Sequence, residues 1–137
     1  MIMNDRPLIL LAGRQVDAIV QPLIDAGFAV RLLTRDSTAG SSAERIELAE
    51  GGLAEASTIR RAARGCSGAL AAPAAVNEAG NIIRVLAGTE VELLVIAGEK
   101  YRETLQKYAR DLGSDPVFIA AETITSSIEL FRRELMY

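Results

Sequence analysis

The sequence predicts an α/β protein in which a parallel sheet of about six strands lies between two layers of helices, forming a three-layer sandwich. Short apolar runs alternate with amphipathic segments along the 137 residues, and the connections between them are short. Most of the runs are apolar at consecutive positions, which is typical of strands that are covered on both faces. Regular alternation of strands and helices gives parallel strands joined by right-handed crossovers.

The expected strands are six apolar runs that Gly, Pro or Asp separates from their neighbours. They span residues 8–12, 29–34, 45–49, 68–72, 92–97 and 117–121. The first helix precedes Gly27. Pro22 inside this helix should either kink it or delay its regular start, because proline removes a backbone hydrogen bond.

Two later helices carry apolar residues at i, i+4, i+7 and i+11, a spacing that places side chains on one face of a helix. We expect each set to form a buried stripe. The first set is Tyr101, Leu105, Tyr108 and Leu112, and the second is Ile124, Ile128, Phe131 and Leu135.

Length and composition limit the class of protein. The chain has the length of a single domain, residues 1–137, and half of its residues are apolar. Its net charge is −3 and no long basic cluster occurs, which argues against a nucleic-acid partner. The longest apolar run, residues 69–76, is too short to cross a membrane, and the start lacks a secretory signal. With a single cysteine, these features predict a cytoplasmic protein.

The chain contains no histidine. This excludes Ser-His-Asp and Cys-His catalysis and removes the commonest transition-metal ligand. The sequence shows no carboxylate cluster that indicates a metal site, so we expect no metal. Acid–base chemistry would have to come from Tyr, Lys, Glu or Asp side chains.

The most informative motif is Gly13-Arg14-Gln15, which lies between the first strand and the first helix. A strand, a tight turn and a helix direct free backbone N–H groups at an anion, and glycines in the turn let a pyrophosphate approach. Only Gly13 remains here, while Leu10 or Leu11 and Val16 stand where glycines are expected. The motif therefore predicts a Rossmann-like fold whose phosphate cradle is degenerate.

Several segments taken together resemble the NmrA-like group of atypical short-chain dehydrogenases/reductases. Residues 12–15 and 23–36 are similar to that family's strand–turn–helix–strand unit, and residues 50–53 resemble its Gly-Asp-Leu element. Residues 59–66 resemble the helix before its fourth strand, and residues 81–97 resemble its fourth helix and fifth strand. The resemblance covers most of the chain in order and implies an NAD(P)-binding Rossmann-like domain.

The residues expected to contact the cofactor are Gly13, Arg14, Gln15, Thr34, Arg35, Gly52 and Leu53. Arg14 and Arg35 follow neighbouring strands at the edge where open α/β sheets bind ligands. Two guanidiniums there suit a 2′-phosphate, which favours NADP over NAD, and Thr34 stands where an NAD binder often has an acid. The alternative is that both arginines are solvated loop residues.

The chain also departs from the family. The usual turn reads Gly-x-x-Gly-x-x-Gly, and here either Leu10 and Val16 replace its first and third glycines or the turn has lost about three residues. We therefore expect the affinity for a dinucleotide to be weak or lost. Gly52 replaces the Asp that lies beside the adenine, the chain has no Tyr-x-x-x-Lys, and the segment that builds the substrate pocket is expected to be absent.

These departures favour a non-catalytic or weakly nucleotide-binding module that acts as a regulator, sensor or subunit, with no catalytic residue assigned. One alternative is a small NAD(P)H-dependent oxidoreductase whose pocket is completed by a partner chain. The other is a regulatory nucleotide-binding domain similar to the TrkA-N domains of potassium-transport systems, which carry an Asn near the fourth helix as Asn81 does. The sequence leaves open whether the protein is an enzyme.

Three further features have two interpretations each. Lys100 and Tyr101 follow the fifth strand and could form an acid–base pair, but Tyr101 fits better as part of a buried stripe. Cys66 fits a half-buried structural thiol better than a nucleophile. The apolar end of the last helix, residues 135–137, and an open sheet edge predict a homodimer or a partner protein.

Overall fold

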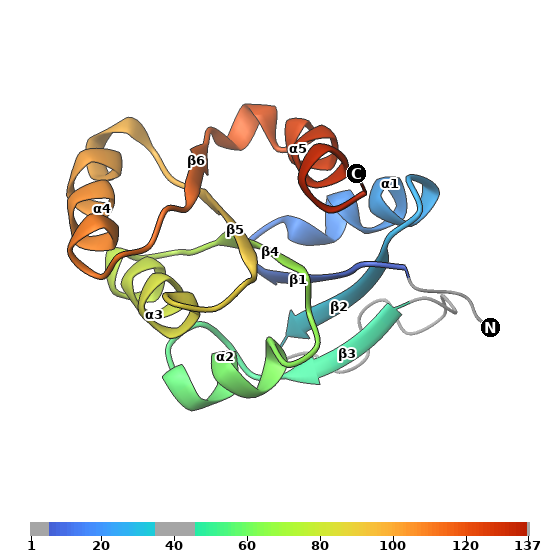
Figure 1. Ribbon diagram of the computed structural model, residues 1–137, viewed down its shortest axis with the longest axis horizontal. Helices are drawn as coiled ribbons and strands as arrows, with labels where there is room; N and C mark the ends of the chain where they lie inside the picture. The colour runs from blue at the N-terminus through green and yellow to red at the C-terminus, as the bar shows by residue number, and fades with distance from the viewer. Residues whose placement is uncertain (1–5, 35–45, 137) are drawn as a thin grey trace.

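The computed structural model describes residues 6–34 and 46–136, and they form the predicted three-layer sandwich (Figure 1). Within these ranges a sheet of six parallel strands has the order β3-β2-β1-β4-β5-β6. The strands are β1 (Leu8–Gly13), β2 (Ala29–Thr34), β3 (Ile46–Glu50), β4 (Gly68–Ala72), β5 (Glu92–Ile96) and β6 (Val117–Ile119). The α-helices are α1 (Val20–Asp25), α2 (Ala56–Ala62), α3 (Val76–Leu86), α4 (Glu99–Asp111) and α5 (Ser126–Leu135), and the 3-10 helices are η1 (Val16–Ile19) and η2 (Ala121–Thr123).

The strand order reverses beside β1. The chain runs outward from β1 through β2 to β3, and it then returns to the other side of β1 for β4, β5 and β6. The register pairs Ala12 of β1 with Leu33 of β2 on one side and with Ala71 of β4 on the other. Because all strands are parallel, their carboxyl ends share one edge of the sheet.

The observed strands begin and end close to the residues predicted from the sequence. The predicted bounds of β2 and β4 are those observed, and β3 lies one residue later than expected. Strand β6 is shorter than predicted and ends at Ile119, because the chain then turns into η2. Residues 35–45, which connect β2 to β3, lie outside the described residues.

Each face of the sheet has its own hydrophobic core. Helices α2, α3 and α4 cover one face, where Leu10, Val95 and Ile82 are among the buried residues. Helix η1, α1 and α5 cover the other face. There the rings of Phe28 and Phe131, both fully buried, meet edge to face with 6.2 Å between their centroids. The alternation of core residues along each strand is what two covered faces require.

Helix α1 starts late. The chain leaves β1 through a short turn, forms one turn of 3-10 helix in η1, and becomes α-helical only at Val20. Pro22 is the third residue of α1, where a proline breaks no helical hydrogen bond. Of the two expectations for Pro22, the delayed start is therefore correct.

The buried stripe predicted for α4 is wrong in part. Leu105 is buried, but Tyr101, Tyr108 and Leu112 are 46, 37 and 39% exposed. Helix α4 lies at one end of the molecule beside the edge of the sheet and buries only Leu105 and Ala109 fully (Figure 1). The stripe predicted for the last helix is confirmed in its centre, since Phe131 is fully buried and Ile128 packs beside it.

No helix in the described part of the chain is both long enough and apolar enough to cross a membrane.

Candidate functional site

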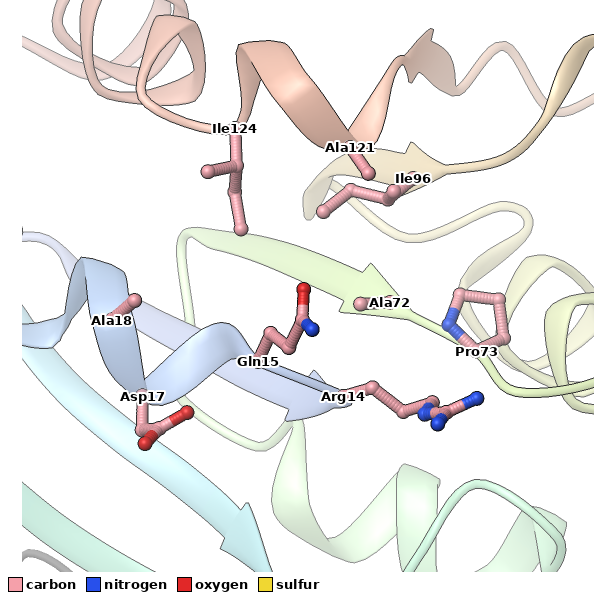
Figure 2. Close-up of a pocket in the computed structure, with 9 residues that line it drawn as sticks. All are labelled: Arg14, Gln15, Asp17, Ala18, Ala72, Pro73, Ile96, Ala121 and Ile124. Atoms are coloured by element: carbon pink, nitrogen blue, oxygen red, sulfur yellow. The ribbon is translucent and has the colours of Figure 1, made fainter.

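An open cleft lies where the strand order reverses, at the carboxyl ends of β1, β4 and β5 (Figure 2). In open α/β sheets this is the position at which ligands bind, because the helices after β1 and β4 leave toward opposite faces. The cleft has a volume of about 580 Å³. It is lined by Arg14, Gln15, Asp17, Ala18, Ala72, Pro73, Ile96, Ala121 and Ile124.

Gly13 is needed by the fold itself. Its φ is +108°, a conformation that residues with a β-carbon rarely adopt, and a β-carbon there would collide with the backbone carbonyl of Ala72. The next amide, that of Arg14, donates a 2.9 Å hydrogen bond to the same carbonyl oxygen. The glycine of the predicted nucleotide turn therefore lets β1 end against β4, whether or not a phosphate binds.

The turn after β1 contains only Arg14 and Gln15. Leu10 lies within β1, paired with Arg31 and Ala69, so it belongs to the strand and not to the turn. This favours the interpretation that the turn has lost residues. Gln15 has a φ of +64°, and the next residue, Val16, is 2% exposed in the core. A buried Val16 and a 3-10 turn leave fewer free N–H groups for a phosphate than a glycine turn followed by a regular helix.

The cleft has a polar side, formed by Arg14 and Gln15, and an apolar side, formed by Ile96 and Ile124. Figure 2 shows the guanidinium of Arg14 extending toward Pro73 and the amide of Gln15 pointing into the space below Ile96 and Ile124. Asp17 points away from Gln15, on the opposite side of η1. Arg14 can therefore attract an anionic group at one end of the cleft, and Ile96 and Ile124 can cover an apolar ring at the other.

Of the remaining predicted cofactor residues, the structure describes Thr34, Gly52 and Leu53, and none of the three lines this cleft. Thr34 ends β2 next to Gly13, and its carbonyl accepts a 3.0 Å hydrogen bond from the amide of Gly51. Leu53 is 3% exposed, so its side chain belongs to the core. Gly52, which lies between Gly51 and Leu53, is half-buried. Arg35 lies outside the described residues.

Asn81 ties α3 to this part of the chain. Its amide donates hydrogen bonds of 3.0 and 3.2 Å to the carbonyls of Leu53 and Ala54. The Asn that suggested a likeness to TrkA-N domains therefore fixes the loop after β3.

A second cleft of about 530 Å³ adjoins the first and shares Pro73 and Ile96 with it. Its walls are mostly apolar, and Glu99, Lys100 and Tyr101 line one part. The ammonium of Lys100 lies 5.6 Å from the centroid of the Tyr101 ring. Tyr101 is thus an exposed residue beside a cleft and not the first member of a buried stripe.

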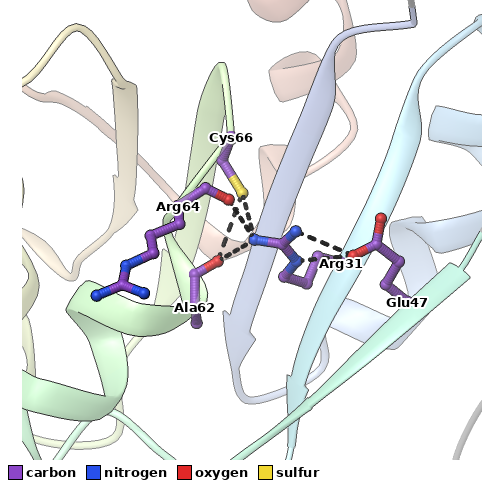
Figure 3. Close-up of polar contacts among 5 residues, drawn as sticks. All are labelled: Arg31, Glu47, Ala62, Arg64 and Cys66. Carbon is purple, nitrogen blue, oxygen red and sulfur yellow. Dashed lines mark hydrogen bonds and ion pairs between the residues drawn. The ribbon is translucent and has the colours of Figure 1, made fainter.

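Arg31, a charged residue in the middle of the apolar run of β2, is not among the site residues predicted from the sequence. Its Nη1 donates 2.6 Å hydrogen bonds to the carbonyls of Ala62 and Arg64, and its Nε and Nη2 bind Glu47 at 3.1 and 3.0 Å (Figure 3). Arg31 therefore caps the carboxyl end of α2, which suits a cation. An arginine within a buried strand was the available signal.

Cys66 belongs to the same cluster. Its Sγ lies 3.6 Å from Nη1 of Arg31 and from the carbonyl oxygen of Ala62. Burial raises the pKa of the Cys66 thiol, the guanidinium of Arg31 lowers it, and Glu47 raises it. The half-buried position and the raised pKa fit the predicted structural thiol. The neighbouring cation is Arg31, whereas Arg64 contributes only its carbonyl.

Among residues 6–34 and 46–136, no three His, Cys, Asp or Glu side chains gather into a group that could hold a metal ion.

Comparison with known proteins shows the fold. No family model matches the chain, and no curated protein matches it in sequence. The triphenylmethane reductase of Citrobacter sp., complexed with NADP(H), has a TM-score of 0.67 and 15% identity over 83% of this chain and 48% of its own. A short-chain dehydrogenase/reductase from Veillonella parvula in complex with NADP has a TM-score of 0.63 and 11% identity over 84% of this chain and 68% of its own.

The GsuK channel bound to NAD is similar too, with a TM-score of 0.62 and 13% identity over 86% of this chain and 22% of the channel chain. All three are proteins solved with a nicotinamide dinucleotide. Their likeness to this chain establishes a Rossmann-like fold. The chain spans about half the length of the reductase and a fifth of the channel.

Proposed function

We propose that this chain is a nucleotide-binding Rossmann module, similar to NmrA-like proteins, that acts as a sensor, regulator or subunit and does not complete a reaction alone. The observation that carries the proposal is the cleft at the reversal of strand order, with Arg14 and Gln15 on its floor. That is the place where this fold binds a dinucleotide. The NADP(H)-bound neighbours support a cofactor of that class.

The turn explains why we expect weak binding. A diphosphate is normally held by several backbone N–H groups at a regular helix start, and here Val16 is packed in the core and α1 begins four residues later. Arg14 is then the main attraction for a phosphate, and Asp17 of the same cleft opposes it. A cleft that binds a dinucleotide loosely suits a protein that responds to cofactor concentration.

The test is thermal unfolding and calorimetric titration with NADPH, NADP, NADH and ATP. A ligand at 100 times its Kd stabilises the folded state by about 2.7 kcal/mol. We expect NADPH or NADP to stabilise the wild type, and Arg14→Glu to abolish the shift. Arg60→Glu, the same exchange on the exposed side of α2, should leave it unchanged. No response to any of the four nucleotides would contradict the proposal.

A second candidate is an NAD(P)H-dependent oxidoreductase completed by a partner chain. It is favoured by the second cleft, which adjoins the first and presents Lys100 and Tyr101. A hydride donor needs a dry pocket over its nicotinamide, and both clefts are open in the isolated chain. NADPH oxidation with a quinone or triphenylmethane dye, lost in Tyr101→Phe, would favour this candidate. Nucleotide binding without turnover would favour the sensor.

The third candidate is a regulatory domain like that of the NAD-bound GsuK channel, which shares the fold. It predicts tighter binding of NADH or ATP than of NADPH. The same titration therefore separates it from the first candidate by the order of affinities.

A further inference from the structure

Helix α4 presents an apolar stripe that the described part of the chain covers only in part. Tyr101, Tyr108 and Leu112 project within about 40° of one another around the helix, at 100° per residue. All three are more than a third exposed. Two large aromatic side chains in one exposed row are unusual on a monomer and typical of a protein interface.

The neighbouring surface continues the patch. Val76, at the start of α3, is 40% exposed and lines the same cleft as Tyr101. Gly80, one turn further along α3, lies beside the Tyr108 ring, whose Cε2 would be 3.7 Å from a β-carbon at that position. Helix α3 thus supports one side of the stripe, while the other side of α4 faces away from the molecule (Figure 1).

We propose that this stripe is a homodimer interface in which α4 packs antiparallel against α4 of a second copy. Two of the charges beside the stripe, those of Lys100 and Asp111, are self-complementary. Lys100 lies in the first turn of α4 and Asp111 is its last residue, and the two project within about 20° of each other on the same side of the stripe. A twofold axis near the middle of the helix places Lys100 of each copy opposite Asp111 of the other.

The size of the side chains agrees with this arrangement. Thr104 lies between Tyr101 and Tyr108 on the exposed side of α4. In the antiparallel register that pairs Lys100 with Asp111, Thr104 lies level with Lys107 of the second copy and one residue from the level of Tyr108, so a small side chain lies beside a large one twice. A parallel pair would place Lys100 of both copies at the same end and on opposite sides of the seam, where neither reaches an Asp111. The pairing of Lys100 with Asp111 therefore favours the antiparallel dimer.

This interface differs from the one expected from the end of the chain. At the end of α5, Leu135 packs against the core and the Cε of Met136 lies near Gly27, while Met136 is 38% exposed. On α4, three exposed apolar side chains share one side of a single helix.

The test is sedimentation equilibrium of the full chain between about 5 and 500 µM, because a face this small should hold a dimer only weakly. We expect a reversible monomer–dimer equilibrium in the wild type. Lys100→Asp and Asp111→Lys should each weaken it by at least about tenfold, since each places like charges opposite one another. An equimolar mixture of the two variants should dimerise with a Kd within about threefold of the wild type, because both ion pairs re-form in the heterodimer.

A loss of helix stability would not account for the weaker dimerisation of these variants. An acid in the first turn and a base in the last turn both suit the helix dipole, so neither substitution weakens α4. Glu103→Lys is the control, because Glu103 projects about 140° from Tyr108 and should leave the Kd unchanged. A wild type that stays monomeric at the highest concentration would overturn the proposal. A dimer whose Kd is unchanged in both Lys100→Asp and Asp111→Lys would also overturn it, and so would an equimolar mixture of the two variants that stays monomeric.

Discussion

The amide of Arg14 and the carbonyl oxygen of Ala72 form a 2.9 Å hydrogen bond that joins the end of β1 to the end of β4. This bond crosses the point where the strand order reverses and the first cleft begins. It brings the two backbones so close that position 13 has no room for a side chain. This backbone contact therefore forms the bottom of the cleft. The fold requires Gly13 whether or not a ligand binds.

We predict that Gly13→Ala lowers the free energy of unfolding by at least about 2 kcal/mol, from a strained φ and the collision with Ala72. Urea denaturation at low protein concentration measures this. Gly80→Ala is the matched control, because a β-carbon there meets only Tyr108 at an ordinary 3.7 Å. That variant should gain about 0.5–1 kcal/mol from its helical position. Equal effects at the two glycines would contradict the assignment.

A glycine at position 16 tests whether the turn is a decayed cofactor cradle. Val16 is 2% exposed, so Val16→Gly should cost about 2–4 kcal/mol of stability through a cavity and a freer backbone. The same variant should bind NADPH more tightly by calorimetry, because the backbone can then approach a phosphate. Val20→Gly, made in the same core at the start of α1, should lose stability without gaining affinity. Unchanged affinity in Val16→Gly would count against a cofactor-binding ancestry.

The sequence predicts the sheet well because a strand between two helical layers is apolar at most positions. β4 is such a strand throughout and β2 is one except at Arg31 and Thr34, and the bounds of both agree with the prediction. Strand β6, at the edge, carries a weaker signal, since Val117 is exposed and the apolar residues after Ile119 belong to a turn. Periodicity also places Tyr101 and Tyr108 on one side of α4 correctly. It does not say whether that side meets the core or another molecule.

The candidate site is less predictable. Gly13, Arg14 and Gln15 are found at the carboxyl edge as expected, because topology alone determines where β1 ends. The side-chain contacts of Arg31 depend on where the carboxyl end of α2 lies relative to β2. No local sequence pattern gives the distance between these two elements.

The capping of α2 by Arg31 gives a further prediction. Arg31→Met keeps the aliphatic length but removes the donors to the carbonyls of Ala62 and Arg64, and it should cost about 1–3 kcal/mol. Glu47→Gln removes only the ion pair. Because the Glu47 side chain is 59% exposed, that loss should stay below about 1 kcal/mol. Chemical denaturation compares the two, and a larger loss in Glu47→Gln would show that the ion pair, not the cap, holds this corner.

The thiol of Cys66 should make stability depend on pH in the alkaline range. Burial raises its pKa in the folded protein above the ordinary value of 9.0, while the unfolded chain titrates near that value. The folded state thus binds the proton more tightly, and stability is complete below pH 9.0 and falls as pH rises toward the folded pKa. The useful quantity is the difference from Cys66→Ala, because that variant shares every other titratable group with the wild type.

We expect the advantage of the wild type over Cys66→Ala in free energy of unfolding to shrink as the pH rises above 9.0, with the sign set by the raised pKa. Iodoacetamide should label the folded protein at about pH 8 more slowly than the urea-unfolded chain, because the thiolate is the reactive form. An advantage that grows with pH, or faster labelling in the folded state, would mean that Arg31 outweighs burial at this thiol. Cys66 would then be a reactive cysteine held by a guanidinium and not a structural one.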